Sequence, residues 1–189
     1  MLKRRELKDC EQLYPLLCDP AIFPFVRQKA QSYEEYLFLT KHTLEEEENG
    51  NTISRTILDE WNQPIGTISL FDIEGGAGFL GTWIGKPYHG KGYNRLAKDA
   101  FFDELFYDLD ITTVYMRIRK LNIRSKKAAE KLPYVVNAVE THPSIYEAVN
   151  APFEEPVFDL YMVPKDLYVL HTKRVDRVEV VLAEDRLEA

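Results

Sequence analysis

The sequence predicts an α+β (mixed α/β) fold, with a central, mostly antiparallel twisted sheet of six to seven strands and helices on both of its faces. Two patterns support this prediction. Segments 52–58, 65–73 and 79–84 alternate apolar and polar residues and are separated by short turns, which is typical of an antiparallel meander. The chain then changes to strand, loop, helix, strand, helix and strand, which is typical of layered α+β proteins. Its 189 residues fit one domain.

The first part of the chain contains a short strand and two helical segments. Residues 2–7 are the candidate first strand, and the helical stretch after them ends before Asp19, which a proline follows. A longer helix is predicted over 32–48. Ser32, with Glu35 three residues later, forms a capping-box pattern that predicts where this helix begins.

The second part of the chain continues with helices and strands in turn. Predicted helices cover 94–109 and 122–132, and predicted strands cover 112–118, 134–136 and 156–163. No internal repeat or low-complexity segment interrupts them. We therefore expect these elements to join the meander in one folded domain.

The charge is negative overall and unevenly placed. The formal net charge of −7 argues against nucleic acid as a partner of the whole chain. Residues 86–131, however, hold 11 Lys and Arg against 6 Asp and Glu. Solvated helix faces would explain this basic segment, and so would a bound anion. The composition leaves both explanations open.

The two cysteines and the apolar pattern indicate the compartment. Cys10 and Cys18 lie near one end with no further cysteine, so they form neither a disulfide framework nor a four-ligand zinc site. We expect free thiols, no metal and a reducing, cytoplasmic environment. No run of 18 apolar residues occurs, and the charged first residues have no apolar segment behind them. We therefore expect neither a membrane span nor a secretory signal.

A glycine-rich turn over residues 89–94 lies between a predicted strand and a predicted helix. Gly90 and Gly92 lack the Cβ atoms that would keep a ligand away from the backbone. The first N–H groups of the following helix have no acceptor within the helix and lie at the positive end of its dipole. Phosphate groups bind readily at such helix starts. Three basic side chains add positive charge nearby: Lys91, Arg95 and Lys98.

Three known explanations of such a glycine-rich turn fit this sequence less well: a P-loop, a dinucleotide-binding motif and a purely structural turn. Residues 85–91 match the P-loop spacing up to its lysine, but Gly92 takes the place of the Ser or Thr that binds Mg²⁺. Pro87 also lies in that cradle and has no N–H to donate. The dinucleotide fingerprint lacks its third glycine. A turn that needs glycine only for its backbone shape stays open.

The turn resembles the Gln/Arg-x-x-Gly-x-Gly/Ala motif of the GNAT superfamily of N-acetyltransferases. Gly92 occupies the central position, whereas His89 replaces Gln or Arg and Asn94 replaces Gly or Ala. Residues 122–132 are similar to the Asn-x-x-Ser helix of that family, and 80–84 are similar to the strand before its turn. The resemblance is closest to the branch that acetylates ribosomal-protein N-termini and small amines.

The resemblance divides the chain into two parts. It implies an N-acetyltransferase domain over residues 1–163 and leaves 164–189 as a C-terminal extension. Alternation over 174–182 indicates an extra strand or a subunit contact in this extension. Pro133 stands where the family has a helix-ending glycine, so we expect the strand from Tyr134 to be displaced.

The resemblance also implies that the chain binds acetyl-CoA. In the family, backbone amides before the turn contact the pantetheine arm and the thioester oxygen, the turn binds the diphosphate, and basic residues meet the 3′-phosphate. Trp83 as core filling, Asn122 as a helix N-cap and His89 in solvent are alternatives that stay open. The cofactor-binding residues expected here are Trp83, Ile84, His89, Gly90, Lys91, Gly92, Tyr93, Asn94, Arg95, Asn122 and Lys127.

The expected catalytic groups are less well defined. Many relatives use a tyrosine as the acid toward the leaving thiolate, but its positions here are Ala128 and Ala129. The resemblance therefore implies Ser125 as the acid, and a helix-surface or packing role for this residue stays open. Asp72 and Glu74 are the nearest carboxylates to the strand where many relatives carry a general base. Water, or an amine that is already neutral, would also suffice.

These expectations give one enzymatic function and one alternative. The chain is expected to move an acetyl group from acetyl-CoA to a primary amine, carried by a small molecule or a protein N-terminus. Outside the basic segment 86–131 the chain is acidic, and this negative charge would attract an acceptor that is positively charged. We expect no nucleic acid or membrane partner, and a monomer or homodimer. The alternative is a non-catalytic coenzyme A-binding module, because the tyrosine and the strand carboxylate are absent.

Overall fold

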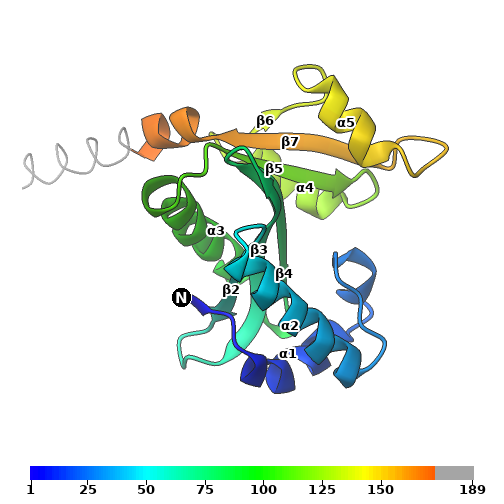
Figure 1. Cartoon of the computed structure of the whole chain (residues 1–189), viewed down its shortest axis with the longest axis vertical. Helices are drawn as coiled ribbons and strands as arrows, with labels where there is room; N and C mark the ends of the chain where they lie inside the picture. Colours follow the sequence, from blue (N-terminus) through cyan, green and yellow to red (C-terminus); the bar gives the residue numbers. More distant parts are fainter. Residues whose placement is uncertain (173–189) are drawn as a thin grey trace, which may run out of the picture. The chain divides into compact units, whose positions relative to one another are not determined.

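The computed structural model describes residues 1–172, which form two compact units, Met1–Asp110 and a second unit that begins at Ile111 (Figure 1). The first unit contains β1 (Leu2–Arg4), η1 (Leu7–Asp9), α1 (Cys10–Leu17), η2 (Phe23–Phe25), α2 (Tyr33–Glu48), β2 (Ile53–Leu58), β3 (Pro64–Glu74), β4 (Ala77–Ile84), η3 (Lys86–Tyr88), α3 (Tyr93–Asp103) and the π-helix η4 (Glu104–Asp108). The second contains β5 (Thr113–Arg119), α4 (Ile123–Glu130), β6 (Val136–Asn137), α5 (Pro143–Asn150) and β7 (Phe158–Pro164).

Antiparallel strands form the framework of each unit. In the first, β1, β2, β3 and β4 are paired in that order. In the second, β7 lies between β5 and β6 and pairs with both. The predicted meander is confirmed, and the seven strands of the described residues agree with the expected six to seven. The predicted α+β class is therefore confirmed.

Helices cover both faces of the strands in the first unit. Neighbouring residues of a strand point to opposite faces, so Arg55 and Thr56 of β2 mark the two sides. The hydroxyl of Thr56 donates to Asp9 in η1 at 2.8 Å, whereas Nε of Arg55 donates to Glu104, where η4 begins, at 2.9 Å. Figure 1 accordingly shows α1 and α2 on one side of these strands and α3 on the other.

Apolar residues pack on both faces of the strands in the first unit. Trp83 of β4 packs against a buried cluster formed by Cys10, Leu13, Leu17, Ile22, Val26, Ala30 and Tyr36. The buried residues of α3 and η4 are Ala97, Lys98, Phe101, Phe102, Leu105 and Phe106. Lys98 is the only charged residue among these six, and it belongs to the helix that follows the glycine-rich turn.

Local signals account for two element boundaries. The hydroxyl of Ser32 accepts a hydrogen bond from the Glu35 amide at 3.1 Å, which confirms the predicted start of α2. β6 begins at Val136 rather than at Tyr134, as expected from Pro133.

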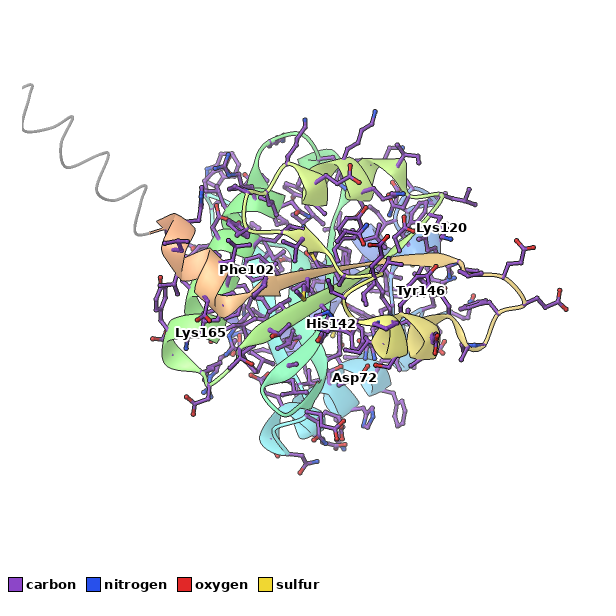
Figure 2. The ribbon with its side chains drawn as sticks, turned by 90° about the horizontal axis from the view of Figure 1, so that it is seen from above. Asp72, Phe102, Lys120, His142, Tyr146 and Lys165 are labelled. Carbon is purple, nitrogen blue, oxygen red and sulfur yellow. The ribbon has the colours of Figure 1, made fainter. Side chains whose placement is uncertain are left out.

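Two elements differ from the sequence-based expectation. The helix predicted over 94–109 ends as regular α-helix at Asp103 and continues as η4. α5 was not predicted. It starts with Pro143 after His142, whose ring meets that of Tyr115 edge-on with the ring centres 5.7 Å apart. Figure 2 labels His142, which precedes the helix, and Tyr146, which belongs to it.

The C-terminal extension is described only in part. Pro164 still belongs to β7, and residues 165–172 are helical. The strand or subunit contact expected over 174–182 lies outside the described residues and stays a prediction. Within 1–172, no helix combines the length and the apolar character needed to cross a membrane.

Candidate active site

The glycine-rich turn has the backbone shape that its two glycines permit. Gly90 and Gly92 have φ of 77° and 87°, in the left-handed region that favours glycine. A Cβ atom on either residue would meet no atom of the chain within 4 Å. The glycines are therefore required by the backbone conformation and not by close packing, and open space adjoins the turn.

Helix α3 begins at this turn, with Gly92 as its N-cap. The Arg95 amide donates to the Gly92 carbonyl at 3.0 Å, so this amide is satisfied within the helix start. The amides of Tyr93 and Asn94 have no acceptor among residues 1–172. These two N–H groups lie at the positive end of the helix dipole, where they can bind an anion.

The side chain of His89 holds the turn to the preceding strand. Its Nε2 lies 2.8 Å from the carbonyl oxygen of Ile84. A carbonyl only accepts hydrogen bonds, so Nε2 carries the proton and donates. His89 therefore contributes to the shape of the turn, and its predicted contact with coenzyme A stays a prediction.

The basic side chains of the turn do not behave alike. Lys91 is exposed, with Nζ 5.6 Å from the ring centre of Tyr88, and Arg95 is also exposed, with Nε 3.6 Å from Asp99. Lys98 differs because only 7% of it is exposed, and burial lowers its pKa to about 8 although Asp99 opposes this shift. The first two can meet a ligand in solvent, whereas Lys98 cannot.

The backbone amides of β4, the strand before the turn, point alternately toward β3 and away from it. The Gly85 amide donates to the Ile65 carbonyl of β3 at 2.8 Å. Because antiparallel partners alternate, the Trp83 amide also points toward β3, and the amides of Thr82 and Ile84 point away from it. Of the two residues predicted to contact the cofactor, only Ile84 offers an N–H on that other edge.

Helix α4, in the second unit, brings Asn122 and Ser125 together. The side-chain oxygen of Asn122 accepts from the Ser125 amide at 3.1 Å, so Asn122 is the N-cap. Its NH₂ group is not used in this bond. Ser125 is half-buried and Lys127 is exposed. The catalytic role of Ser125 and the binding role of Lys127 stay predictions.

The two candidate bases lie near the β3–β4 turn, where Figure 2 labels Asp72. Asp72 has φ of 54° at an irregularity of β3, and its carboxylate is 2.6 Å from a guanidinium nitrogen of Arg27. Glu74 is exposed next to the turn. Both carboxylates are exposed, and that of Asp72 is engaged in the ion pair with Arg27.

Sequence reasoning missed several contacts of these site residues. Tyr93 donates its phenol proton to Glu60, in the turn between β2 and β3. In α4, Lys126 and Glu130 contact Asp159 and Tyr161 of β7. No local pattern indicates a contact between residues 31 or more positions apart. Among residues 1–172, no group of three or more His, Cys, Asp or Glu side chains could hold a metal ion.

Comparison with known proteins places the chain in a family. The family model of the acetyltransferase (GNAT) domain matches residues 1–135. The chain therefore belongs to the GNAT acetyltransferase family, as the two motifs predicted. It is an acetyl-CoA-dependent N-acetyltransferase by class. A search of curated proteins finds no significant match.

Solved structures share the fold at low sequence identity. A spermidine N-acetyltransferase from Vibrio cholerae, in complex with CoA and spermine, has a TM-score of 0.68 and 15% identity over 89% of this chain and 97% of its own. An acetyltransferase from Salmonella typhimurium that modifies the N-terminal serine of a 50S ribosomal subunit protein has 0.67 and 18%, over 86% and 91%. FdhC, described as a nucleotide-linked sugar GNAT, has 0.72 and 17%, over 93% and 92%.

Proposed function

We propose that this protein acetylates a primary amine of a small cationic molecule or of a protein N-terminus, with acetyl-CoA as the donor. The observation that carries the proposal is the start of α3. There, the free amides of Tyr93 and Asn94 adjoin open space beside Gly90 and Gly92. Such a helix start suits the diphosphate of coenzyme A. Exposed Lys91 and Arg95 add the positive charge that phosphates require.

The remaining site residues suit the other steps of the transfer. The amide of Ile84 points away from β3, and the NH₂ group of Asn122 is a donor that the N-cap bond does not use. As the amine nitrogen bonds to the acetyl carbon, the bond from that carbon to sulfur breaks. The nitrogen loses a proton to Glu74 or to water, and the thiolate takes one from the Ser125 hydroxyl, which solvent reprotonates.

The acceptor class follows from charge and from the neighbours in fold. The net charge of −7 favours a cationic acceptor. The related structures include one named for spermidine and one that modifies an N-terminal serine. A polyamine and a protein N-terminus are therefore the acceptors to test first. We expect the protein to act in the cytoplasm, without a metal, as a monomer or homodimer.

A non-catalytic coenzyme A-binding module is the second candidate. Ala128 and Ala129 occupy the positions of the family's acid, and Asp72 is paired with Arg27. An acetyl-CoA titration by calorimetry, followed by thiol release with a panel of amines, separates the two. Binding with amine-dependent thiol release supports the enzyme. Binding without release supports the module, and no binding contradicts both.

The substitution Gly92→Ala tests the turn directly. Alanine at φ of 87° strains the backbone by about 1 kcal/mol and tilts the amides that face the diphosphate. We expect the Kd for coenzyme A to rise at least about tenfold, because the diphosphate contacts depend on amide direction. Gly50→Ala is the matched control, since Gly50 has φ of 78° and equally open surroundings. Equal Kd values for the two variants would contradict the proposed binding mode.

A further inference from the structure

Helix α4 has little apolar contact to hold it in place. Of its eight residues, only Ala129 is buried, and Ile123 at its start is exposed. The glycine that ends this helix in the family is Pro133 here, and β6 begins only at Val136. Hydrophobic burial therefore contributes little to the orientation of α4, and polar contacts decide it.

Two polar contacts join α4 to β7. Nζ of Lys126 lies 2.5 Å from a carboxylate oxygen of Asp159, and the hydroxyl of Tyr161 donates to Glu130 at 2.8 Å. Both ends of the Lys126–Asp159 pair are largely shielded, with 27% and 18% of the side chains exposed. Tyr161 is buried. Its burial, together with the bond to Glu130, raises its pKa.

The spacing of the four residues makes these contacts a matched pair. Lys126 and Glu130 are one helical turn apart, or about 6 Å along the axis of α4. Asp159 and Tyr161 point to the same face of β7 and are about 6.7 Å apart along it. The two spans agree, so α4 is held at two points and cannot pivot about either one alone. β7 itself is hydrogen-bonded on both edges, to β5 and to β6, so its own position is fixed by the sheet.

These two contacts lie on the same helix as Ser125, which is assigned to catalysis, and next to Asn122, which is assigned to cofactor binding. Asn122, the N-cap, is one turn before Lys126 on the same stripe of α4, and its oxygen binds the Ser125 amide. A change in the angle of α4 on β7 therefore moves the Ser125 hydroxyl. We propose that Lys126, Glu130, Asp159 and Tyr161 form a two-point clamp of positioning residues that aims Ser125 at the leaving thiolate. This inference rests on the proposed function.

Two conservative variants test the α4 clamp: Asp159→Asn and Tyr161→Phe. We expect each to lower kcat about tenfold, because small displacements of a reacting group reduce the rate strongly. The KM for acetyl-CoA changes by a smaller factor, since the diphosphate turn belongs to the other unit and only Asn122 and Lys127 of the proposed cofactor contacts lie at α4. The exposed Lys131→Ala variant, just past α4, is the control and leaves both parameters unchanged.

A second measurement distinguishes the positioning of Ser125 from a general loss of activity. In a Ser125→Ala background, the clamp variants cause no further loss of kcat, because the residue that they aim is absent. Hydrogen exchange of residues 123–130 speeds up in both variants and not in Lys131→Ala, whether or not a transferase assay succeeds. Losses that multiply with Ser125→Ala, or unchanged exchange in α4, would overturn the clamp. Wild-type protein without amine acetylation would overturn the proposed function instead.

Discussion

Lys98 shows how one side chain in α3 departs from its expected role. The sequence placed its charge beside the phosphate turn, but only 7% of Lys98 is exposed. No hydrogen bond or ion pair to its amine is found in residues 1–172, and burial lowers its pKa to about 8. A charge buried in this way destabilises the folded state. The basic segment therefore offers one cation fewer to a ligand than its composition implies.

Replacing Lys98 by methionine is expected to stabilise the protein in a pH-dependent way. The unfolded state binds the Lys98 proton more tightly, so wild-type stability rises with pH between about 8 and the ordinary value of 10.5. Below pH 8, Lys98→Met gains the whole difference, about 3 kcal/mol. The gain disappears near pH 11. Urea unfolding at several pH values measures it, with the exposed Lys131→Met as control. A gain that does not change with pH would contradict this account.

His89 illustrates what a motif can and cannot predict for one residue. Its place in the turn was evident from sequence, because the glycines around it fix the pattern. Its bond to the Ile84 carbonyl depends on the folded path of η3, which no local pattern encodes. The same holds for Asp72, whose pairing with Arg27 joins residues 45 positions apart.

At the level of elements, the boundaries set by local chemistry were predictable. Ser32 caps α2, and Pro133 delays β6, because capping and proline geometry involve only neighbouring residues. η4 was not predictable, since a π-helix departs from the 3.6-residue period by which helices are recognised. α5 was missed although Pro143 suits a first helical turn, because its apolar face is short.

The buried Arg55 shows why the tertiary links between elements escape sequence analysis. Its guanidinium binds Glu47 of α2 at 2.6 Å and also Glu104 at the start of η4. Burial alone would lower the pKa of Arg55, but the hydrogen bonds that it donates to its two carboxylate partners outweigh burial and raise it. The sequence shows three charged residues in separate segments, and only the fold makes them one ionic group.

For the whole molecule, the fold and the family were within reach of the sequence, and the acceptor was not. The strand order and the two motifs agree with the GNAT family match over residues 1–135. The identity of the acceptor depends on surfaces formed by distant segments, so composition supplies only the sign of its charge. The net charge of −7 indicates a positively charged acceptor and does not identify it further.

This charge leads to a salt prediction. If long-range attraction brings the acceptor to the enzyme, raising ionic strength from about 0.02 M to about 0.2 M screens it. We expect the KM for a polyamine to rise several-fold over this range, and that for a monoamine to rise less, because attraction scales with acceptor charge. Initial rates at saturating acetyl-CoA measure both. Identical salt dependence for the two amines would exclude electrostatic attraction as the basis of acceptor preference.

The N-cap bond of α4 determines which part of the Asn122 side chain can interact with a ligand. Because the side-chain oxygen of Asn122 accepts from the Ser125 amide, its NH₂ group is the part of that side chain proposed to donate to a carbonyl oxygen of acetyl-CoA. Aspartate caps helices as well as asparagine does, so Asn122→Asp should keep the melting temperature. It would nevertheless present oxygen where nitrogen stood, and the KM for acetyl-CoA should rise about tenfold through the lost donor. This substitution therefore separates the role of Asn122 as the N-cap of α4 from its proposed role in binding acetyl-CoA.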